Sequence, residues 1–429
     1  MKQKRNITCE DIERRRTLFY TYFLIRNFPK LWTFRVLYGK IKPRGVKNMK
    51  LKVGVIFGGK SVEHEISIIT ALQAMDYIDT DYYEVVPIYI TKDLTWYSGG
   101  MFRYIDSFNN YNLIEKYGTK VHLVNKNGRY ILERAGFIKS ELTEIHIAFP
   151  MVHGMGVEDG SIQGYLSQIG VPCVGNNIYS SAICQDKVFT KQILKSNNIP
   201  ITNYIWFYES DYQNNKENLF KKIDKLNYPL IIKPACLGSS VGIEIIKNKE
   251  ELDSTIKRVL SYDHKIVIEE MIKGTEFNIS ILRSNEKYLT SAIEEIKCEV
   301  EFRAYKDKCY KDGEENDTIK RYCPAKIKEE LEDEIKEIAH KTFNQIFSTG
   351  FCRIDFLYDG KKLYVNEINP IPNCFCHHLW IENNISYKEL LNILIKDAIK
   401  TKNIHDNMTT TIDSTILKDL KTKDIKEMI

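Results

Sequence analysis

The sequence lacks an uninterrupted apolar run long enough to cross a bilayer. Its most apolar early stretch, residues 18–37, is interrupted by Arg26, Pro29, Lys30 and Arg35, whereas a membrane-spanning helix needs about 20 consecutive apolar residues. A recognisable cleavable signal peptide is also missing. We therefore expect a cytoplasmic protein rather than an integral membrane protein.

Cysteine spacings typical of disulfide frameworks or zinc sites are missing as well. The ten cysteines are scattered, without a repeated pair separated by two residues, which favours reduced thiols of the cytosol. The densest group of soft ligands is Cys374, Cys376, His377 and His378. These four lie too close together to surround zinc comfortably. Packing cysteines beside a histidine of a substrate pocket are the alternative interpretation.

Basic charge is scarce outside the first 50 residues. Residues 1–50 hold 14 of the 62 Lys and Arg but 3 of the 57 Asp and Glu, so the remainder carries 48 basic against 54 acidic residues. A nucleic-acid-binding domain would carry its basic surface on the folded part. This distribution therefore argues against nucleic acid as a partner.

What is present is a chain long enough for several compact units. Residues 1–48 form a basic, aromatic leader that precedes Met49. This leader is either an extension outside the folded core or a segment that contacts a membrane surface weakly. We expect four further segments: an N-terminal α/β domain at residues 49–185, a central subdomain at 186–275, a C-terminal subdomain at 276–400 and a polar tail at 401–429.

Apolar periodicity predicts the elements of these units. The first is an open parallel α/β layer, with strands at 51–57, 84–90 and 145–152, a helix at 161–169, and an earlier helix whose apolar face is Ile66, Ile69, Leu72 and Met75. The second has a helix at 187–196 and antiparallel strands at 230–233, 243–246 and 265–270. The third has helices at 327–347 and 388–400 and a strand at 363–369.

Two neighbouring strands near the C-terminus carry the strongest chemical signal. Asp355 lies on one strand, and Glu367 and Asn369 lie on the same face of the next because side chains alternate along a strand. Such oxygen ligands suit magnesium that also contacts nucleotide phosphates. Arg353, two residues from Asp355, projects on the same face. Solvated acidic residues are the alternative.

A second signal is a lysine that ends a buried strand before a glycine- and serine-rich turn. Lys233 supplies a point charge, and the turn, which contains Ser239 and Ser240, aims backbone N–H groups at phosphate oxygens. An ordinary hairpin turn is the alternative. Glu269 follows near the end of the next strand and Glu276 comes after Gly274, where carboxylates can accept hydrogen bonds from an adenine amino group or from ribose hydroxyls. An exposed glutamate on an edge strand is the alternative.

Over residues 50–400 these motifs resemble the D-alanine–D-alanine ligase family of ATP-grasp enzymes. The matching stretches occur in the family's order, at residues 55–67, 153–164, 185–187, 233–242, 353–355 and 366–369. The resemblance implies an α/β fold, α+β in its ATP-grasp part, in which two later sheets hold ATP between them. It also implies an ATP-dependent ligase of cell-wall synthesis that forms a homodimer.

The resemblance further implies roles for individual residues. Lys187 and Lys233 would hold ATP phosphates and Glu269 and Glu276 the adenosine, while Asp355, Glu367 and Asn369 would hold two magnesium ions, with manganese as a substitute. The first D-amino acid would be bound through its amino group by Glu63, with Ser239 hydrogen-bonded nearby, His153 beside it, and Arg353 stabilising the phosphorylated intermediates.

The acceptor half departs from the family's pattern. The family places Lys-Tyr in a loop over the site, and here Lys308 fits but is followed by Cys309, with Tyr310 one position later. Asn373 and His378 stand where the family has a glycine and a serine that serve the second amino acid. We expect these two residues to set acceptor choice.

Two other functions stay open at this level. One is a specialised ligase with a different acceptor, such as another amine, a thiol or a hydroxy acid. The other is a nucleotide-binding protein without ligase turnover, although such a binder has little need for Arg353 beside three metal ligands.

Overall fold

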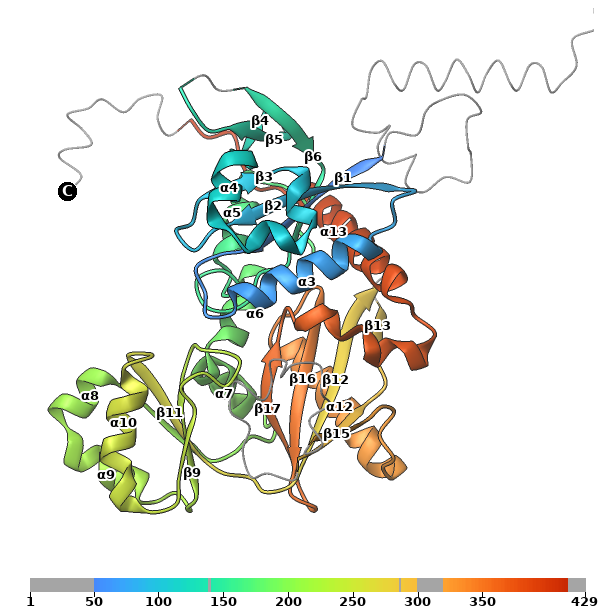
Figure 1. Cartoon of the computed structure of the whole chain (residues 1–429). Coiled ribbons are helices and arrows are strands. Elements are labelled where there is room, and N and C mark those ends of the chain that lie inside the picture. Colours follow the sequence, from blue (N-terminus) through green and yellow to red (C-terminus); the bar gives the residue numbers. More distant parts are fainter. Residues whose placement is uncertain (1–49, 138–139, 285–286, 299–318, 416–429) are drawn as a thin grey trace, which may run out of the picture. The chain divides into compact units, whose positions relative to one another are not determined.

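The computed structural model describes residues 50–137, 140–284, 287–298 and 319–415 of the 429-residue chain (Figure 1). The leader at residues 1–48, the loop with Lys308, and residues 416–429 of the predicted tail lie outside the described residues. The described part contains three β-sheets with associated helices. None of the helices in this part is both long enough and apolar enough to span a membrane.

The first sheet has seven strands in the order β6-β5-β4-β3-β2-β1-β7. The expected parallel pairing holds for β1 with β2 and for β1 with β7. The layer is not parallel throughout, because β3 to β6 extend it as antiparallel strands that we did not predict. The elements are β1 (Leu51–Gly58), α3 (His64–Tyr77), β2 (Tyr83–Ile90), β3 (Trp96–Ser98), η1 (Gly100–Arg103), η2 (Ile105–Phe108), α4 (Tyr111–Tyr117), β4 (Thr119–Lys126), β5 (Arg129–Arg134), β6 (Glu141–Ile145), β7 (Ile147–Pro150) and α5 (Ser161–Ile169).

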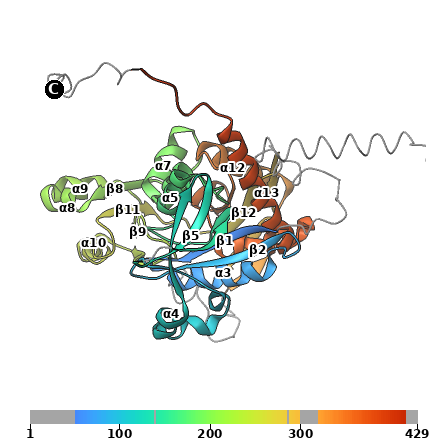
Figure 2. The same cartoon turned by 90° about the horizontal axis from the view of Figure 1, so that it is seen from above.

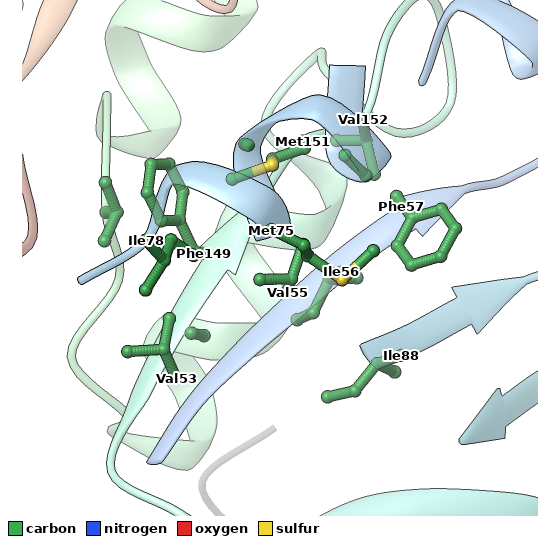
Figure 3. Packing of buried hydrophobic residues seen from close by; sticks show 14 of the residues in the cluster. Val53, Val55, Ile56, Phe57, Met75, Ile78, Ile88, Phe149, Met151 and Val152 are labelled. Carbon is green, nitrogen blue, oxygen red and sulfur yellow. The ribbon is translucent and has the colours of Figure 1, made fainter. Parts of the chain in front are cut away.

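Strand β1 is the centre of the largest apolar core. Its residues Val53, Val55, Ile56 and Phe57 are completely buried, as expected for a parallel strand covered on both faces (Figure 3). Helix α3 packs on β1. The predicted apolar face of α3 was wrong in part: Ile69 is exposed, whereas the small residues of the helix, among them Ala71, face the core.

The second sheet has four strands in the order β10-β9-β11-β8, and its pairs β10–β9, β9–β11 and β11–β8 are antiparallel, as predicted. Helices α8, α9 and α10 lie beside it (Figures 1 and 2). The connecting helices are α6 (Ile178–Gln185) and α7 (Lys187–Ser196), and the sheet's elements are β8 (Tyr204–Tyr208), α8 (Glu209–Asn214), α9 (Lys216–Ile223), β9 (Leu230–Pro234), β10 (Glu244–Ile246), η3 (Lys249–Glu251), α10 (Leu252–Leu260) and β11 (Lys265–Glu270).

The third sheet is antiparallel, in the order β15-β14-β12-β16-β17, and β13 pairs with β12. Helix α12 contacts β12 and β16 and covers this sheet's apolar core. The elements are β12 (Thr275–Ser284), β13 (Lys287–Thr290), β14 (Glu294–Cys298), β15 (Ile319–Tyr322), α12 (Glu329–Gln345), β16 (Phe351–Tyr358), β17 (Leu363–Asn369), η4 (Asn373–Asn383) and α13 (Tyr387–Asp406).

Helix α13 returns to the first sheet. It contacts α3 and β7, and its buried residues Leu390, Leu391, Leu394 and Ile395 belong to the same core as β1. The helix continues to Asp406, six residues beyond the expected end at residue 400, so the start of the predicted tail is helical.

The segment between β7 and α6 is joined to the third sheet through Asn176. The side-chain Nδ2 of this buried residue donates to the carbonyl oxygens of Phe351, at 2.5 Å, and Pro370, at 3.3 Å. Its Oδ1 accepts from the Ser348 hydroxyl at 2.5 Å and from the Thr349 N–H at 3.3 Å. One amide thus holds the starts of β16 and of the segment after β17 against the first unit.

We expect Asn176→Ala to lower the free energy of unfolding by roughly 2–4 kcal/mol, because several buried backbone and hydroxyl groups lose their partner. Urea denaturation followed by circular dichroism measures the change. Asn125→Ala is the matched control, since exposed Asn125 also donates to a backbone carbonyl, that of Ile169. Equal effects of the two substitutions would contradict this account.

Candidate active site

A cleft is lined by residues of the third sheet, of helices α6 and α7, and of the loops that follow β1, β7, β9 and β17. It brings together most of the predicted site residues, namely Glu63, His153, Lys187, Ser239, Glu276, Arg353, Asp355, Glu367, Asn369 and Asn373. Lys233, Ser240, Glu269 and His378 do not line it, and Lys308 lies outside the described residues. The residues that line it without having been predicted include Glu158, Asn278 and Arg321.

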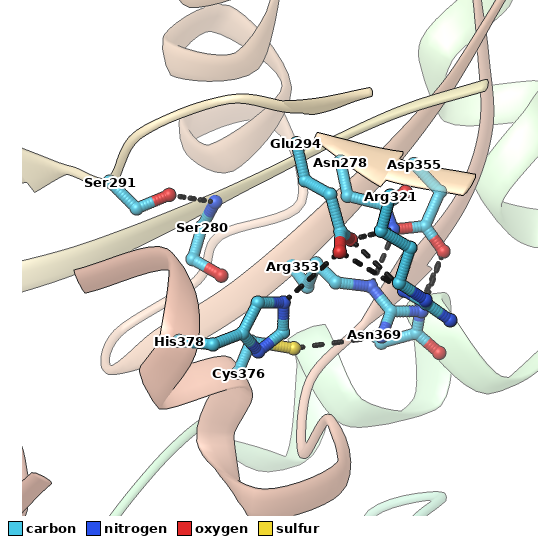
Figure 4. Close-up of polar contacts among 10 residues, drawn as sticks. All are labelled: Asn278, Ser280, Ser291, Glu294, Arg321, Arg353, Asp355, Asn369, Cys376 and His378. Atoms are coloured by element: carbon cyan, nitrogen blue, oxygen red, sulfur yellow. Dashed lines mark hydrogen bonds and ion pairs between the residues drawn. The ribbon is translucent and has the colours of Figure 1, made fainter. Parts of the chain in front are cut away.

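At the centre of the third sheet, Arg353 forms a two-pronged ion pair with Asp355. Nε of Arg353 lies 2.6 Å from Oδ1 and Nη2 lies 2.7 Å from Oδ2 of Asp355 (Figure 4). Asn369, on β17, also donates to Asp355 Oδ2 at 3.1 Å. The adjacent strands β16 and β17 therefore place the three side chains together, as their spacing predicted.

The electrostatic environment of Asp355 is crowded with carboxylates. Burial raises its pKa to about 6 despite the opposing guanidinium of Arg353, and nearby Glu367 and Glu276 raise it further. Glu367 is the direct cross-strand neighbour of Asp355. Like charges this close favour a cation between them.

A second cluster of buried charge lies on the second sheet. Glu269 forms ion pairs with Lys233, which precedes the glycine- and serine-rich turn, and with Lys191 of α7 at 2.6 Å. Burial opposes ionisation of Glu269, but Lys191 and Lys233 lower its pKa far below the usual range. Thr202 donates to the same carboxylate at 2.5 Å. Lys233, the predicted phosphate ligand, and Glu269, the predicted adenosine ligand, therefore neutralise each other's charge in this structure.

Lys187 begins α7 and points its amino group into the cleft. Its Nζ donates to the carbonyl oxygen of Leu237 at 2.6 Å, at the entry to the glycine- and serine-rich turn. Burial lowers the pKa of Lys187, and the Glu367 carboxylate opposes that shift. The amino group is therefore held close to the turn and interacts with the Glu367 carboxylate of β17.

The glycine- and serine-rich turn reaches across to the first unit. Ser239 and Ser240 have φ values of 50° and 60°, a left-handed conformation that non-glycine residues adopt at a cost. In this conformation the Ser239 hydroxyl donates to Glu63 Oε1. The contact expected from the family resemblance is thus formed, at the N-terminus of α3.

Beside Glu63 lie two buried ionisable groups. Burial lowers the pKa of His153 to about 4, so its ring is neutral near pH 7, and its Nε2 lies 3.1 Å from the Thr70 hydroxyl. Burial, reinforced by Glu63, raises the pKa of Glu158 to about 8. Glu158 accepts from the backbone N–H groups of Gly154 at 2.8 Å and Ile371 at 3.1 Å, and so connects the His153 loop to the segment after β17.

The residues expected at the acceptor end lie on η4. Asn373 is its first residue and lines the cleft. His378 is half-exposed, and its Nε2 lies 3.4 Å from Glu294 Oε1 (Figure 4). Cys376, between them, is buried with its Sγ 3.6 Å from Arg353 Nη1.

The soft-metal alternative is not supported by these positions. Cys376 contacts Arg353 and His378 contacts Glu294, while the ring of His377 lies 4.7 Å from that of Tyr387. In the described ranges, no group of three or more His, Cys, Asp or Glu side chains is placed to hold a metal ion.

Sequence comparison finds relatives along most of the chain. The family described as "D-ala D-ala ligase N-terminus" matches residues 52–176, and "D-ala D-ala ligase C-terminus" matches residues 193–396. The D-alanine–D-alanine ligase of Thermosipho melanesiensis is 35% identical over 369 residues, which cover 86% of this chain and 98% of the relative. D-alanine–D-alanine ligase B of Clostridium tetani is 33% identical, covering 82% and 95%.

Solved structures agree with this comparison. The VanG D-Ala:D-Ser ligase from Enterococcus faecalis is similar with a TM-score of 0.69 and 27% identity, over 82% of this chain and all of that one. The D-alanine–D-alanine ligase from Coxiella burnetii gives a TM-score of 0.70 and 25% identity, over 89% and 99%.

The burial of neutral His153 predicts a pH-dependent contribution to stability. Because its pKa falls from the usual 6.5 to about 4 on folding, this contribution is complete above pH 6.5 and is lost as the pH falls towards 4. We expect the stability advantage of wild type over His153→Gln to shrink by about 3 kcal/mol between pH 7.5 and pH 4. Chemical denaturation at several pH values measures it.

His405→Gln is the control, since His405 is exposed on α13. Glu158 is present in both proteins, so its own titration cancels in the difference between wild type and His153→Gln. A difference that does not change with pH would show that His153 is not buried as a neutral ring.

Proposed function

The chain belongs to the D-alanine–D-alanine ligase family of ATP-grasp enzymes, and from this membership we infer that it is an ATP-dependent, ADP-forming ligase. It joins D-alanine to a second D-amino acid or related acceptor, for peptidoglycan synthesis. We place this reaction in the cytoplasm and the enzyme in a homodimer. The proposal includes a weak contact of residues 1–48 with a membrane surface, which their basic and aromatic composition suits.

The observation that carries the proposal is the convergence of Glu63, Lys187 and Arg353 on one cleft. In our proposal Glu63, fixed by Ser239, binds the ammonium group of the first D-alanine, and the neutral ring of His153 packs beside it. The carboxylate of that D-alanine then faces Arg353. Lys187 supplies positive charge for the phosphate that this carboxylate receives.

ATP binding would redistribute the charges of the second sheet. Lys233 and the turn with Ser240 hold the phosphates, and Glu269 and Glu276 hold the adenosine. Lys233 must then leave Glu269, with which it pairs in the structure. Lys191 remains 2.6 Å from Glu269 and keeps the buried carboxylate neutralised.

We propose that Asp355, Glu367 and Asn369 hold Mg²⁺, or Mn²⁺ in its place, with the ATP phosphates. The residues fit such an ion because the carboxylates of Asp355 and Glu367 are cross-strand neighbours, Asn369 contacts Asp355, and the pKa of Asp355 is raised to about 6. Oxygen ligands of this kind suit magnesium. The ion supplies charge neutralisation of the phosphates. Binding it would draw Asp355 away from Arg353 and leave the guanidinium available to the reacting groups.

The reaction follows from these positions. An oxygen of the first D-alanine's carboxylate takes the γ-phosphoryl group from ATP, and ADP leaves. The acceptor's uncharged amine then attacks the carbonyl carbon of the acyl phosphate, loses a proton, and the tetrahedral intermediate expels phosphate. Arg353 stabilises the negative charge of both steps. The protein's contribution is positioning and charge stabilisation.

The acceptor end differs from the rest of the cleft. We expect Asn373 and His378, both on η4, to determine which acceptor binds, because they stand where the family has a glycine and a serine. D-alanine is our first candidate, and another amine, thiol or hydroxy acid is the alternative. We consider a nucleotide-binding protein without turnover the weaker candidate, because Arg353 and Asp355 are kept together at a cost of burial.

The decisive experiment is a screen of purified protein with ATP, magnesium and pairs of D- and L-amino acids. Phosphate release and mass spectrometry of the products are measured together. We expect release only with a D-amino acid as first substrate, with one dipeptide formed per phosphate. ATP binding without phosphate release in any pair would contradict a ligase.

We expect Glu367→Gln to reduce ATP-dependent phosphate release by at least about 100-fold, because it removes one charge of the proposed magnesium ligands beside the transferred phosphate. Raising the magnesium concentration should restore part of the rate. Glu330→Gln, on the exposed face of α12, is the control. A rate in Glu367→Gln equal to that of the control would refute the metal assignment.

A further inference from the structure

Strand β14 carries a buried carboxylate that is not among the residues expected at the active site. The side chain of Glu294 is 3% exposed, and burial of a carboxylate is costly unless it is paired. Its oxygens contact Arg321 Nη1 at 3.1 and 3.2 Å and His378 Nε2 at 3.4 Å (Figure 4). Asn278 donates to Oε2 at 3.1 Å.

The two side chains that Glu294 gathers, those of Arg321 and His378, are themselves accessible. The side chain of Arg321 is 53% exposed and that of His378 is 46% exposed. Both contacts of Arg321 with Glu294 come from a single nitrogen, Nη1, so the guanidinium's remaining N–H groups do not contact this carboxylate. Arg321 lines the cleft. A buried anion thus holds two exposed donors, of which Arg321 lies at the cleft wall.

The strand register places this group next to the reaction centre. Arg321 is the cross-strand partner of Ile296, which lines the cleft, and Ile296 lies on the same face of β14 as Glu294. Asn278 is the cross-strand partner of both Glu294 and Asp355. On the other side, His378 shares η4 with Cys376, whose Sγ contacts Arg353.

We propose that Arg321 and His378 together bind the carboxylate of the acceptor, and that Glu294 is the positioning residue that holds them for it. This inference rests on the proposed function. In that function the first substrate has its ammonium at Glu63 and its carboxylate at Arg353, so the second substrate's carboxylate is the anion that still needs a partner. A bidentate guanidinium contact suits a carboxylate.

Charge balance explains why Glu294 is needed. Arg321 and a protonated His378 would repel each other, and the anion between them removes that repulsion. Although burial opposes ionisation, His378 and Arg321 lower the pKa of Glu294 to about 2, so it stays charged throughout the neutral range. When the acceptor's carboxylate arrives, it meets two donors already oriented, which reduces the entropy lost on binding.

The test is a competition between an acceptor and its uncharged amide. Enzyme, ATP and magnesium are mixed with D-alanine and D-alaninamide, and mass spectrometry measures the ratio of D-alanyl-D-alanine to its amide. If the screen identifies another acceptor, that acceptor and its amide are used. The product ratio gives the ratio of kcat/KM values, so partial loss of folded protein does not affect it.

We expect wild type to favour the carboxylate, and Glu294→Gln and Arg321→Gln each to lower that preference by about tenfold or more, because a charged hydrogen bond is lost. Arg321→Lys should keep most of the preference. The KM for ATP should stay unchanged in all three. The matched control is Glu295→Gln: Glu295 lies on the opposite face of β14, where it pairs with Lys297 at 3.1 Å, and its substitution should leave the ratio unchanged.

Three results would overturn the inference. The first is a product ratio unchanged in both Glu294→Gln and Arg321→Gln while ligation continues, which leaves the proposed function intact. The second is a raised KM for ATP with an unchanged ratio, which would assign Arg321 to the phosphates. The third is wild-type protein that makes no dipeptide from any pair, which would overturn the proposed function and this inference with it.

Discussion

The structure of the cleft depends on the ion pair between partly buried Arg353 and buried Asp355. Burying two charges costs more than their attraction returns unless the geometry is good and the remaining polar atoms are bonded. Both conditions are met, since two short hydrogen bonds join the pair and Asn369 donates to the same carboxylate. Arg353 also contacts Cys376 of η4. The pair therefore fixes β16, β17 and η4 relative to one another at the point where we place the chemistry.

The same principle governs the second sheet, where Lys233 and Lys191 flank Glu269. In both places the structure pairs groups that we assign to the substrates with opposite charges of the protein itself. A substrate that binds must take the place of one charged partner without leaving the charge of the other partner buried and unpaired. In our proposal Lys191 stays beside Glu269 when Lys233 moves to the phosphates, and Asn369 stays beside Asp355 when Arg353 turns away. We expect this exchange of partners to reduce the cost of binding a highly charged nucleotide.

Sequence reasoning succeeded where the chemistry lies in one short stretch or on two adjacent strands. Arg353, Asp355 and Asn369 are placed by strand alternation, and the structure brings them together. Sequence reasoning failed where a contact depends on the pairing of strands that are far apart in the sequence. Glu294 and Arg321 are 27 positions apart and meet because β14 pairs with β15. Glu158 lay within a motif that we recognised, but only the fold shows that it accepts from Ile371, 213 positions away.

The errors in the predicted fold have causes in the local sequence. Strands β4 to β6 contain many charged residues on their exposed faces, so they gave no continuous apolar signal. In α3 the small residues, among them Ala71, face the core, whereas the periodicity of large apolar residues correctly included Met75 but wrongly included Ile69, which is exposed. Most of the residues that we assign to ATP and magnesium lie on β9, β11, β16 and β17, whereas Glu294, Arg321 and His378 lie on β14, β15 and η4. The latter elements contact the central ion pair through Cys376 and neighbour Asp355 through Asn278. We therefore expect substitutions among Glu294, Arg321 and His378 to alter acceptor choice while the residues that we assign to ATP keep their geometry.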